Sequence, residues 1–347
     1  MSDPVDNTPR VTVLMAVCNA GDFLALALTS ILTQSLAEFE FVVVDDGSTD
    51  GSAEVLARFA LLDRRLVILE NGANLGLTRS LNRGLGRARG RYVARQDADD
   101  LSLPERLARQ VAFLDRHPEI GFVGSAAGMI DAHGEVLEIR RHPVTDTEIR
   151  WMGIFHNPFF HTSVMFRREL VPNDGRLYDE RFSVAQDYDL WVRLLQRTRG
   201  ANLRTPLVCH RLHERRTSRT RREEQRQVAL TVPGRQMREL LPGEGFDDTR
   251  VVALRALFLA RSPRAGWRRL ADSRIMVRLF RRFSWQSGLD PRVVSRLAAG
   301  LVGHLLGEAG WQIVTHPGLA LDLWRLDARE CRRGCRRRIA RFGRLRW

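Results

Sequence analysis

Three aspartates stand where carboxylates could hold a nucleotide and a divalent metal ion. Asp97 and Asp99 belong to the run Asp97-Ala98-Asp99-Asp100, which directly follows the strand-like segment 91–96, and Asp46 follows the apolar segment 39–44. In an extended chain, residues two apart point the same way, so Asp97 and Asp99 leave room for Mn²⁺ or Mg²⁺ between them and a diphosphate. Because an Asp-x-Asp triplet alone is common in solvated loops, its meaning depends on the elements around it.

The N-terminal part of the chain alternates between predicted strands and helices. Strands are expected at 11–17, 39–44, 66–69 and 91–96, and helices at 22–33, 49–61 and 77–88. This alternation predicts an α/β fold with a doubly wound, mostly parallel sheet. Ligands bind such sheets beyond the carboxyl ends of the strands, and the loops there carry Asn19, Asp46, Asp97 and Asp99. Together these features predict a nucleotide-diphosphate pocket.

The later segments divide into two kinds. Further strands are expected at 121–130, 161–166 and 203–209, and further helices at 104–115 and 187–196. Two Pro-Gly pairs mark 233–249 as a linker. Beyond it, apolar pairs line one helical face, at 293/294, 297/298, 301/302 and 305/306. We therefore expect one domain at 1–232 and a helical appendage at 250–347.

The positive charge of the chain is concentrated near its C-terminus. All 55 basic residues are arginine, the net charge is +14, and 22 arginines stand against six acidic residues from Arg250 onward. The segment 325–347 interleaves arginine with apolar residues, which suits an anionic membrane surface. No export signal or membrane-spanning run is visible, and four scattered cysteines indicate neither disulfides nor a zinc site. These features predict a cytoplasmic protein that is peripheral on the inner face of the cell membrane.

Several motifs resemble those of family 2 glycosyltransferases. They follow the family order over residues 10 to 220, in the runs Val44-Asp45-Asp46-Gly47-Ser48, Asn74-Leu75-Gly76-Leu77, Gln96-Asp97-Ala98-Asp99-Asp100, Pro104-Glu105-Arg106-Leu107 and Gln186-Asp187-Tyr188-Asp189-Leu190-Trp191. The resemblance implies a GT-A fold and an inverting, metal-assisted transfer of a sugar from a nucleotide-diphosphate sugar, with UDP favoured. It also implies a glycan or lipid-linked acceptor and a place in cell-surface polysaccharide biosynthesis.

The resemblance gives each matched residue a role. Asp46 would contact the nucleobase, with Asn19 nearby on the nucleotide, while Asp97 would lie against the ribose or sugar of the donor. Asp99 would bind the metal ion on the diphosphate. Gln186 stands where the family usually has an acidic residue, which leaves Asp187 as the catalytic base that takes the proton of the acceptor hydroxyl.

Two histidines and a tryptophan are further candidates. In the family a histidine in this region can complete the metal shell, and we favour His213 for that role. His161 and Trp191 could contact the donor or the acceptor. For His161, a packed and half-buried structural histidine is an equal alternative.

Other functions stay open at this point. A nucleotidyltransferase that makes nucleotide sugars could share the sheet and a metal-binding aspartate, but it needs a Gly-rich loop with a basic residue, which 18–22 does not provide. A processive polysaccharide synthase would carry membrane helices and a Gln-x-x-Arg-Trp motif. A non-enzymatic nucleic-acid-binding protein would explain the basic C-terminus, but no recognition motif supports it, so no specific nucleic acid partner is expected.

Overall fold

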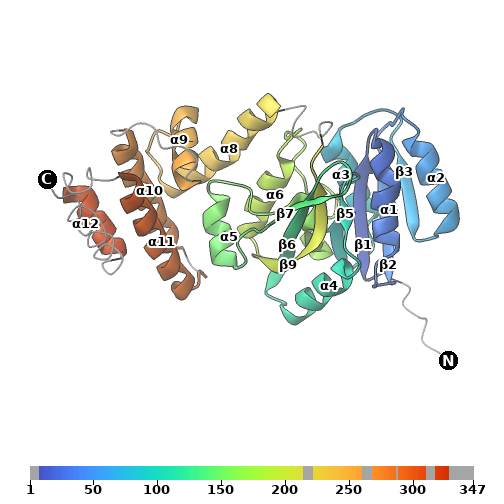
Figure 1. Cartoon of the computed structure of the whole chain (residues 1–347), viewed down its shortest axis with the longest axis horizontal. Coiled ribbons are helices and arrows are strands. Elements are labelled where there is room, and N and C mark those ends of the chain that lie inside the picture. Colours follow the sequence, from blue (N-terminus) through green and yellow to red (C-terminus); the bar gives the residue numbers. More distant parts are fainter. Residues whose placement is uncertain (1–7, 214–221, 260–267, 287, 310–316, 328–347) are drawn as a thin grey trace. The chain divides into compact units, whose positions relative to one another are not determined.

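The computed structural model describes residues 8–213, 222–259, 268–286, 288–309 and 317–327 (Figure 1). The chain divides into two compact units. The first comprises Met1–Ile149 with Asn157–Val228, and the second comprises Arg150–His156 with Ala229–Trp347. Each unit has its own hydrophobic core and is described by itself.

The first unit is built on one mixed sheet of nine strands in the order β3-β2-β1-β4-β8-β6-β9-β5, with β7 paired to β6. Four strands run parallel to one another: β1 (Val11–Val17), β2 (Phe39–Asp45), β3 (Leu66–Glu70) and β4 (Tyr92–Arg95). The others are β5 (Leu101–Ser102), β6 (Ile120–Ile130), β7 (Val136–Arg140), β8 (Met165–Arg167) and β9 (Arg199–Arg211). β8 is antiparallel to both β4 and β6, whereas β9 is parallel to β6. The predicted mostly parallel sheet is confirmed.

Helices cover both faces of this sheet, because alternate residues of each inner strand are apolar on both sides. One core joins Val13 and Met15 of β1 to helices α1 (Leu24–Leu32), α2 (Ser52–Leu62) and α4 (Arg106–Arg116). The opposite core joins Leu14 of β1 to α3 (Leu77–Arg87) and α6 (Gln186–Leu195). The doubly wound arrangement therefore follows from strands that are buried on both faces. Short 3₁₀ turns lie at η1 (Gly21–Phe23), η2 (His161–Ser163) and η3 (Arg168–Leu170).

The expected strand at 161–166 is shorter than predicted. η2 replaces its first half, and only the last part of the segment pairs as β8. Local polar bonds explain the difference: the Ser163 amide and hydroxyl both donate to the Phe160 carbonyl. The Thr162 hydroxyl accepts from the Asp97 amide. Hydroxyl side chains that bond nearby backbone favour a turn over a strand.

The second unit consists of helices. In the described residues these are the part of α8 (Arg222–Leu240) from Ala229 onward, α9 (Asp248–Phe258), α10 (Arg268–Ser284), α11 (Pro291–Ala309) and α12 (Pro317–Leu326). Trp151, in the last turn of α5 (Asp146–Gly153), joins the same core. The apolar face predicted for α11 is buried there through Val302 and Leu305. Residues 328–347, which hold most of the predicted membrane-binding segment, lie outside the described residues.

The start of the predicted linker is helical. Pro233 lies inside α8, because a proline removes only one helical hydrogen bond and the neighbouring turns are held by packing. Met237 and Leu240, which follow it, are buried in the core of the second unit, and so is Phe246. These residues of the segment 233–249 are packed in the second unit, whose longer stretch begins at Ala229.

Gly90, just before β4, lies where the backbones of β1 and β4 come very close together. A Cβ atom there would lie 2.3 Å from the Thr12 amide nitrogen and 2.5 Å from the Val11 carbonyl carbon. We predict that Gly90→Ala destabilises the protein by about 1–3 kcal/mol, because backbone must move to make room. The control is Gly86→Ala in α3, where a Cβ meets nothing within 4 Å and helix propensity favours alanine. Thermal unfolding followed by circular dichroism measures both, and equal melting temperatures for the two variants would contradict the prediction.

Candidate active site

The carboxyl ends of the parallel strands open into a pocket of about 810 Å³ in the first unit. Five of the predicted site residues line it, namely Asn19, Asp46, Asp97, Asp99 and His213. They come from loops that are far apart in the sequence, and the parallel strands bring them together. His161, Asp187 and Trp191 do not line this pocket.

Asp46 is buried and organises the loop that follows β3. One carboxylate oxygen accepts hydrogen bonds from the Leu75 amide at 2.8 Å and the Asn71 side chain at 2.7 Å, and the other accepts from the Gly76 amide at 2.9 Å. The next residue, Gly47, has φ +70°, and a Cβ there would lie 2.8 Å from the backbone of Ala73 and Asn74. The loop therefore closes over the end of β2, with the Asp46 carboxylate as its anchor.

Asn19 connects the loops after β1 and β2. Its backbone is left-handed, with φ +53°, a conformation that asparagine tolerates better than most residues. Its side-chain oxygen accepts from the Thr49 amide at 2.7 Å, and its own amide donates to the Ser48 hydroxyl at 3.1 Å. Asn19 thus fixes the rim of the pocket beside Asp46.

Asp97 is held by a buried arginine that the sequence analysis missed. The Arg95 guanidinium, 1% exposed, donates to the Asp97 carboxylate at 2.6 Å and to the Leu14 carbonyl at 3.2 Å. The sequence did contain a signal for this pair. In an extended chain, residues two apart point to the same side, so the Arg95 and Asp97 side chains must do so. Arg95 neutralises Asp97 and fixes its orientation.

Asp99 pairs with His213, the histidine favoured for the metal site. Their side chains meet at 2.9 Å through His213 Nε2, while His213 Nδ1 is buried and lacks a hydrogen bond to any described residue. The His213 ring packs against Phe23 with centroids 4.8 Å apart. The neighbouring Asp100 accepts instead from His210 and from the Arg211 amide. The three carboxylates of the acidic turn therefore have different partners: Arg95 for Asp97, His213 for Asp99, and His210 with the Arg211 amide for Asp100.

The described residues offer too few ligands for a divalent cation, so the substrate would have to supply some of them. Among the described residues, no group of three or more His, Cys, Asp or Glu is placed to hold a metal ion. Asp97 is already paired with Arg95. Asp99 and His213 can provide two ligands, and diphosphate oxygens with water can provide the others, as is usual for Mg²⁺ on phosphates.

Asp187 is the second residue of α6, and the residue that precedes the helix, Ala185, is left-handed with φ +54°. Its carboxylate accepts from the Asn157 amide group at 2.7 Å. Burial raises the pKa of Asp187, and the charge of Asp97 raises it further, against hydrogen bonds from the Tyr188 amide and Asn157. A carboxylate with a raised pKa binds a proton more readily than an exposed one, as a general base must.

His161 and Trp191 lie behind the pocket. His161 Nε2 is 2.9 Å from the Tyr178 hydroxyl, and the Trp191 ring is fully buried and stacked on Phe122. Burial lowers the pKa of His161 to about 3, and the Arg95 cation adds to the effect. We assign Trp191 a packing role, since no part of its ring is exposed.

Comparison with known proteins decides the family. The model described as "Glycosyl transferase family 2" matches residues 12–172. The O-antigen biosynthesis glycosyltransferase WbnJ of Escherichia coli is 30% identical over 216 residues, which are 60% of this chain and 82% of that protein. The chain belongs to glycosyl transferase family 2. The predicted class of enzyme, a glycosyltransferase, is therefore confirmed.

Two solved structures share the fold. S. aureus TarS 1–349 in complex with UDP-GlcNAc matches with a TM-score of 0.55 at 18% identity, over 86% of this chain and 88% of that chain. The mannosyltransferase PcManGT from Pyrobaculum calidifontis, in complex with GDP-Man and Mn²⁺, matches with a TM-score of 0.50 at 19% identity, over 91% and 86%. The predicted GT-A fold with a helical C-terminal region is confirmed. In the part of the chain that the structure describes, no helix of this glycosyltransferase is long and apolar enough to cross a membrane.

The lowered pKa of His161 predicts a pH-dependent stability. Since the folded-state pKa of about 3 lies below the ordinary value of 6.5, protonation favours the unfolded chain and stability falls as the pH drops below about 6.5. We expect His161→Gln, which can still bond Tyr178, to lose stability less steeply between about pH 7 and pH 4. Urea midpoints across this range measure the slope, with the exposed His133→Gln as control. A parallel decline in wild type and His161→Gln would show that His161 does not titrate as the geometry requires.

Proposed function

We propose that this family 2 enzyme is an inverting glycosyltransferase that moves a hexose from a nucleotide-diphosphate sugar, with UDP favoured, to a glycan or lipid-linked acceptor. The observation that carries the proposal is the meeting of Asp46, Asp97, Asp99 and His213 around one pocket at the carboxyl ends of parallel strands. The UDP-GlcNAc complex of TarS supports a UDP donor. The name of WbnJ supports a place in surface polysaccharide biosynthesis. Family membership favours sugar transfer over nucleotide-sugar synthesis and over nucleic-acid binding.

The donor half of the site would be shared among five side chains. Asp46 and Asn19 hold the loops that form the nucleotide end of the pocket. Asp97, fixed by Arg95, faces the ribose or sugar. Asp99 and His213 would hold Mn²⁺ or Mg²⁺, and the Mn²⁺ complex of PcManGT supports this assignment. Such a cation neutralises the negative charge that grows on the leaving diphosphate.

Asp187 would act on the acceptor. Its carboxylate takes the proton of the attacking hydroxyl, the hydroxyl oxygen forms the new bond to the anomeric carbon, and the nucleoside diphosphate leaves with the electron pair of the old bond. Attack from the side opposite the leaving group inverts the anomeric configuration. The raised pKa of Asp187 suits it to receive that proton, and Asn157 keeps the carboxylate in one orientation.

The donor and the base can be tested together with UDP-, GDP- and dTDP-sugars in the presence of Mn²⁺ or Mg²⁺. We expect one nucleotide series to bind and turn over, and Asp187→Asn to bind the donor normally but to transfer about 10²–10⁴-fold more slowly. Asp99→Asn should weaken metal-dependent binding of the nucleoside diphosphate. Glu54→Gln, on the exposed face of α2, is the matched control.

Two outcomes separate the parts of this proposal. If no nucleotide bound to the wild-type protein, the proposed donor site would be refuted. Unchanged turnover in Asp187→Asn, with donor binding intact, would remove Asp187 as the base while leaving the donor pocket in place.

We further propose that the arginine-rich segment 325–347 attracts the protein to anionic lipid. Replacing Arg332, Arg333, Arg336, Arg337 and Arg338 by glutamine in the full chain should sharply reduce sedimentation with phosphatidylserine vesicles at low salt, because each basic residue near such a surface contributes about 1 kcal/mol. Neutral phosphatidylcholine vesicles are the control. Equal binding of both proteins to the anionic vesicles would rule out this segment as the anchor.

A further inference from the structure

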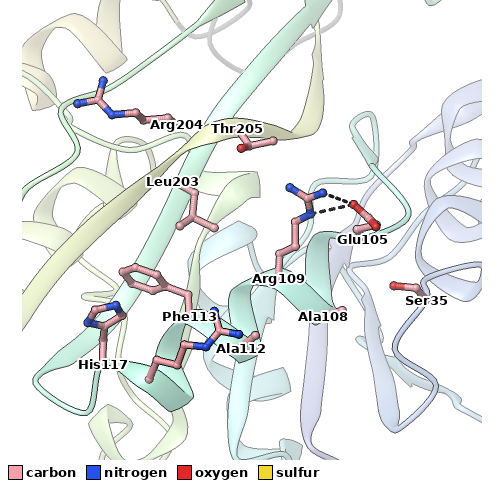
Figure 2. A pocket seen from close by; sticks show the side chains of 11 residues that line it. Ser35, Glu105, Ala108, Arg109, Ala112, Phe113, His117, Leu203, Arg204 and Thr205 are labelled. Atoms are coloured by element: carbon pink, nitrogen blue, oxygen red, sulfur yellow. Dashed lines mark hydrogen bonds and ion pairs between the residues drawn. The ribbon is translucent and has the colours of Figure 1, made fainter.

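A second cavity of about 460 Å³ lies in the first unit, between α4 and the middle of β9 (Figure 2). None of the residues that line it lines the candidate active site. From Arg204 in this cavity to Arg211 at the end of β9, the strand advances by about 23 Å at ~3.3 Å per residue. Arg204 therefore lies far along the strand from Arg211, which contacts the acidic turn.

The charge of the lining is unbalanced. Three arginines stand against one glutamate, and the Arg109–Glu105 ion pair, with Nε at 2.8 Å, uses that glutamate. Figure 2 shows this pair at the start of α4, with Arg204 on β9 and its guanidinium turned away from the pair. Arg116 and Arg204 make no hydrogen bond or ion pair with any described residue, and both are exposed. Unpaired guanidinium groups offer planar, two-point recognition of a carboxylate or a phosphate.

The cavity owes its shape to an irregularity in β9. The β6–β9 ladder pairs Ser125 with Leu203 and then Ala126 with Pro206, so Arg204 and Thr205 have no partners between these rungs. Extra residues of this kind bend a strand and redirect its side chains, and they are built features of a sheet. The bulge places Arg204 and Thr205 on the rim of the cavity.

The rest of the lining is apolar with a few hydroxyl groups. Phe113 and His117 pack with ring centroids 4.5 Å apart, beside Leu203. Ser35 and Thr205 provide hydroxyl groups at the edge (Figure 2). A pyranose has one apolar face and a rim of hydroxyl groups, so an aromatic wall with hydroxyls around it matches a sugar better than it matches a bare ion. The volume lies in the range of small-molecule sites.

We propose that this cavity is a binding site for an anionic saccharide, a sugar that carries a carboxylate or a phosphate group. Arg116 and Arg204 supply the positive charge that attracts the anionic group, and the Phe113–His117 pair supports the ring. The site is distinct from the donor pocket, so its existence does not depend on which nucleotide sugar the enzyme uses.

The test measures binding to the full-length protein by calorimetry, with glucuronate and glucose 6-phosphate as probes and with glucose and inorganic phosphate for comparison. We expect the two anionic sugars to bind more tightly than either comparison compound. The double variant Arg116→Gln/Arg204→Gln should lose their binding by about tenfold or more. The double variant Arg58→Gln/Arg64→Gln, which removes two exposed arginines outside both cavities, should bind as wild type does.

Other results overturn the proposal. It fails if inorganic phosphate binds as tightly as the anionic sugars, because the ring would then contribute nothing. It also fails if no anionic sugar binds, or if the two double variants lose binding equally. UDP binding to the same proteins reports separately on the donor pocket. If Arg116→Gln/Arg204→Gln still binds UDP, the variant is folded. If wild type does not bind UDP, the proposed function is refuted, but the proposal for this cavity is not.

Discussion

The acidic turn of this enzyme depends on one buried cation, the guanidinium of Arg106. It donates to the Gln96 side chain, the Ser102 hydroxyl, the Arg95 carbonyl and the Gln110 side chain, all at 2.6–3.1 Å. These bonds join the end of β4, β5 and α4, so Asp97 and Asp99 stand on a turn that α4 holds from behind. Burial, together with the nearby charge of Arg95, lowers the pKa of Arg106 to about 9. The residue nevertheless remains charged at neutral pH, and a buried charge persists only where polar groups surround it.

A second buried arginine, Arg95, reduces the negative charge that a substrate would encounter at the acidic turn. Without Arg95, the carboxylates of Asp97 and Asp99 would both repel a diphosphate. Arg95 compensates Asp97, which leaves Asp99 beside His213 as the place where added positive charge matters most. Among the described residues this site offers Asp99 and His213 as candidate metal ligands. A cation bound there would share its remaining positions with the diphosphate, and so would bind best when the donor is present.

The sequence predicted what depends on local pattern and missed what depends on tertiary contacts. Strands buried on both faces are continuous apolar runs, so β1 and β2 could be recognised at once, and the loops after them followed. The 3₁₀ turn at His161 depends on hydroxyl bonds of Thr162 and Ser163, which periodicity does not reveal. The helix through Pro233 depends on the burial of Met237, which overrides the turn signal. The Asp99–His213 pair, 114 residues apart, was reached only through resemblance to a family.

β9 contacts the acidic turn at one end and lines the arginine-lined cavity in its middle. At its carboxyl end, Arg211 donates its amide to Asp100 and its Nε to the Asp99 carbonyl, so the strand and the acidic turn fix each other. In its middle, Arg204 and Thr205, which have no partners in the β6–β9 ladder, line the arginine-lined cavity. A slip of one residue in the β6–β9 ladder would reverse the side chains on both sides of it. The bulge accommodates the extra residues within β9. Arg204 can therefore line the cavity while Arg211 keeps its hydrogen bonds to the acidic turn.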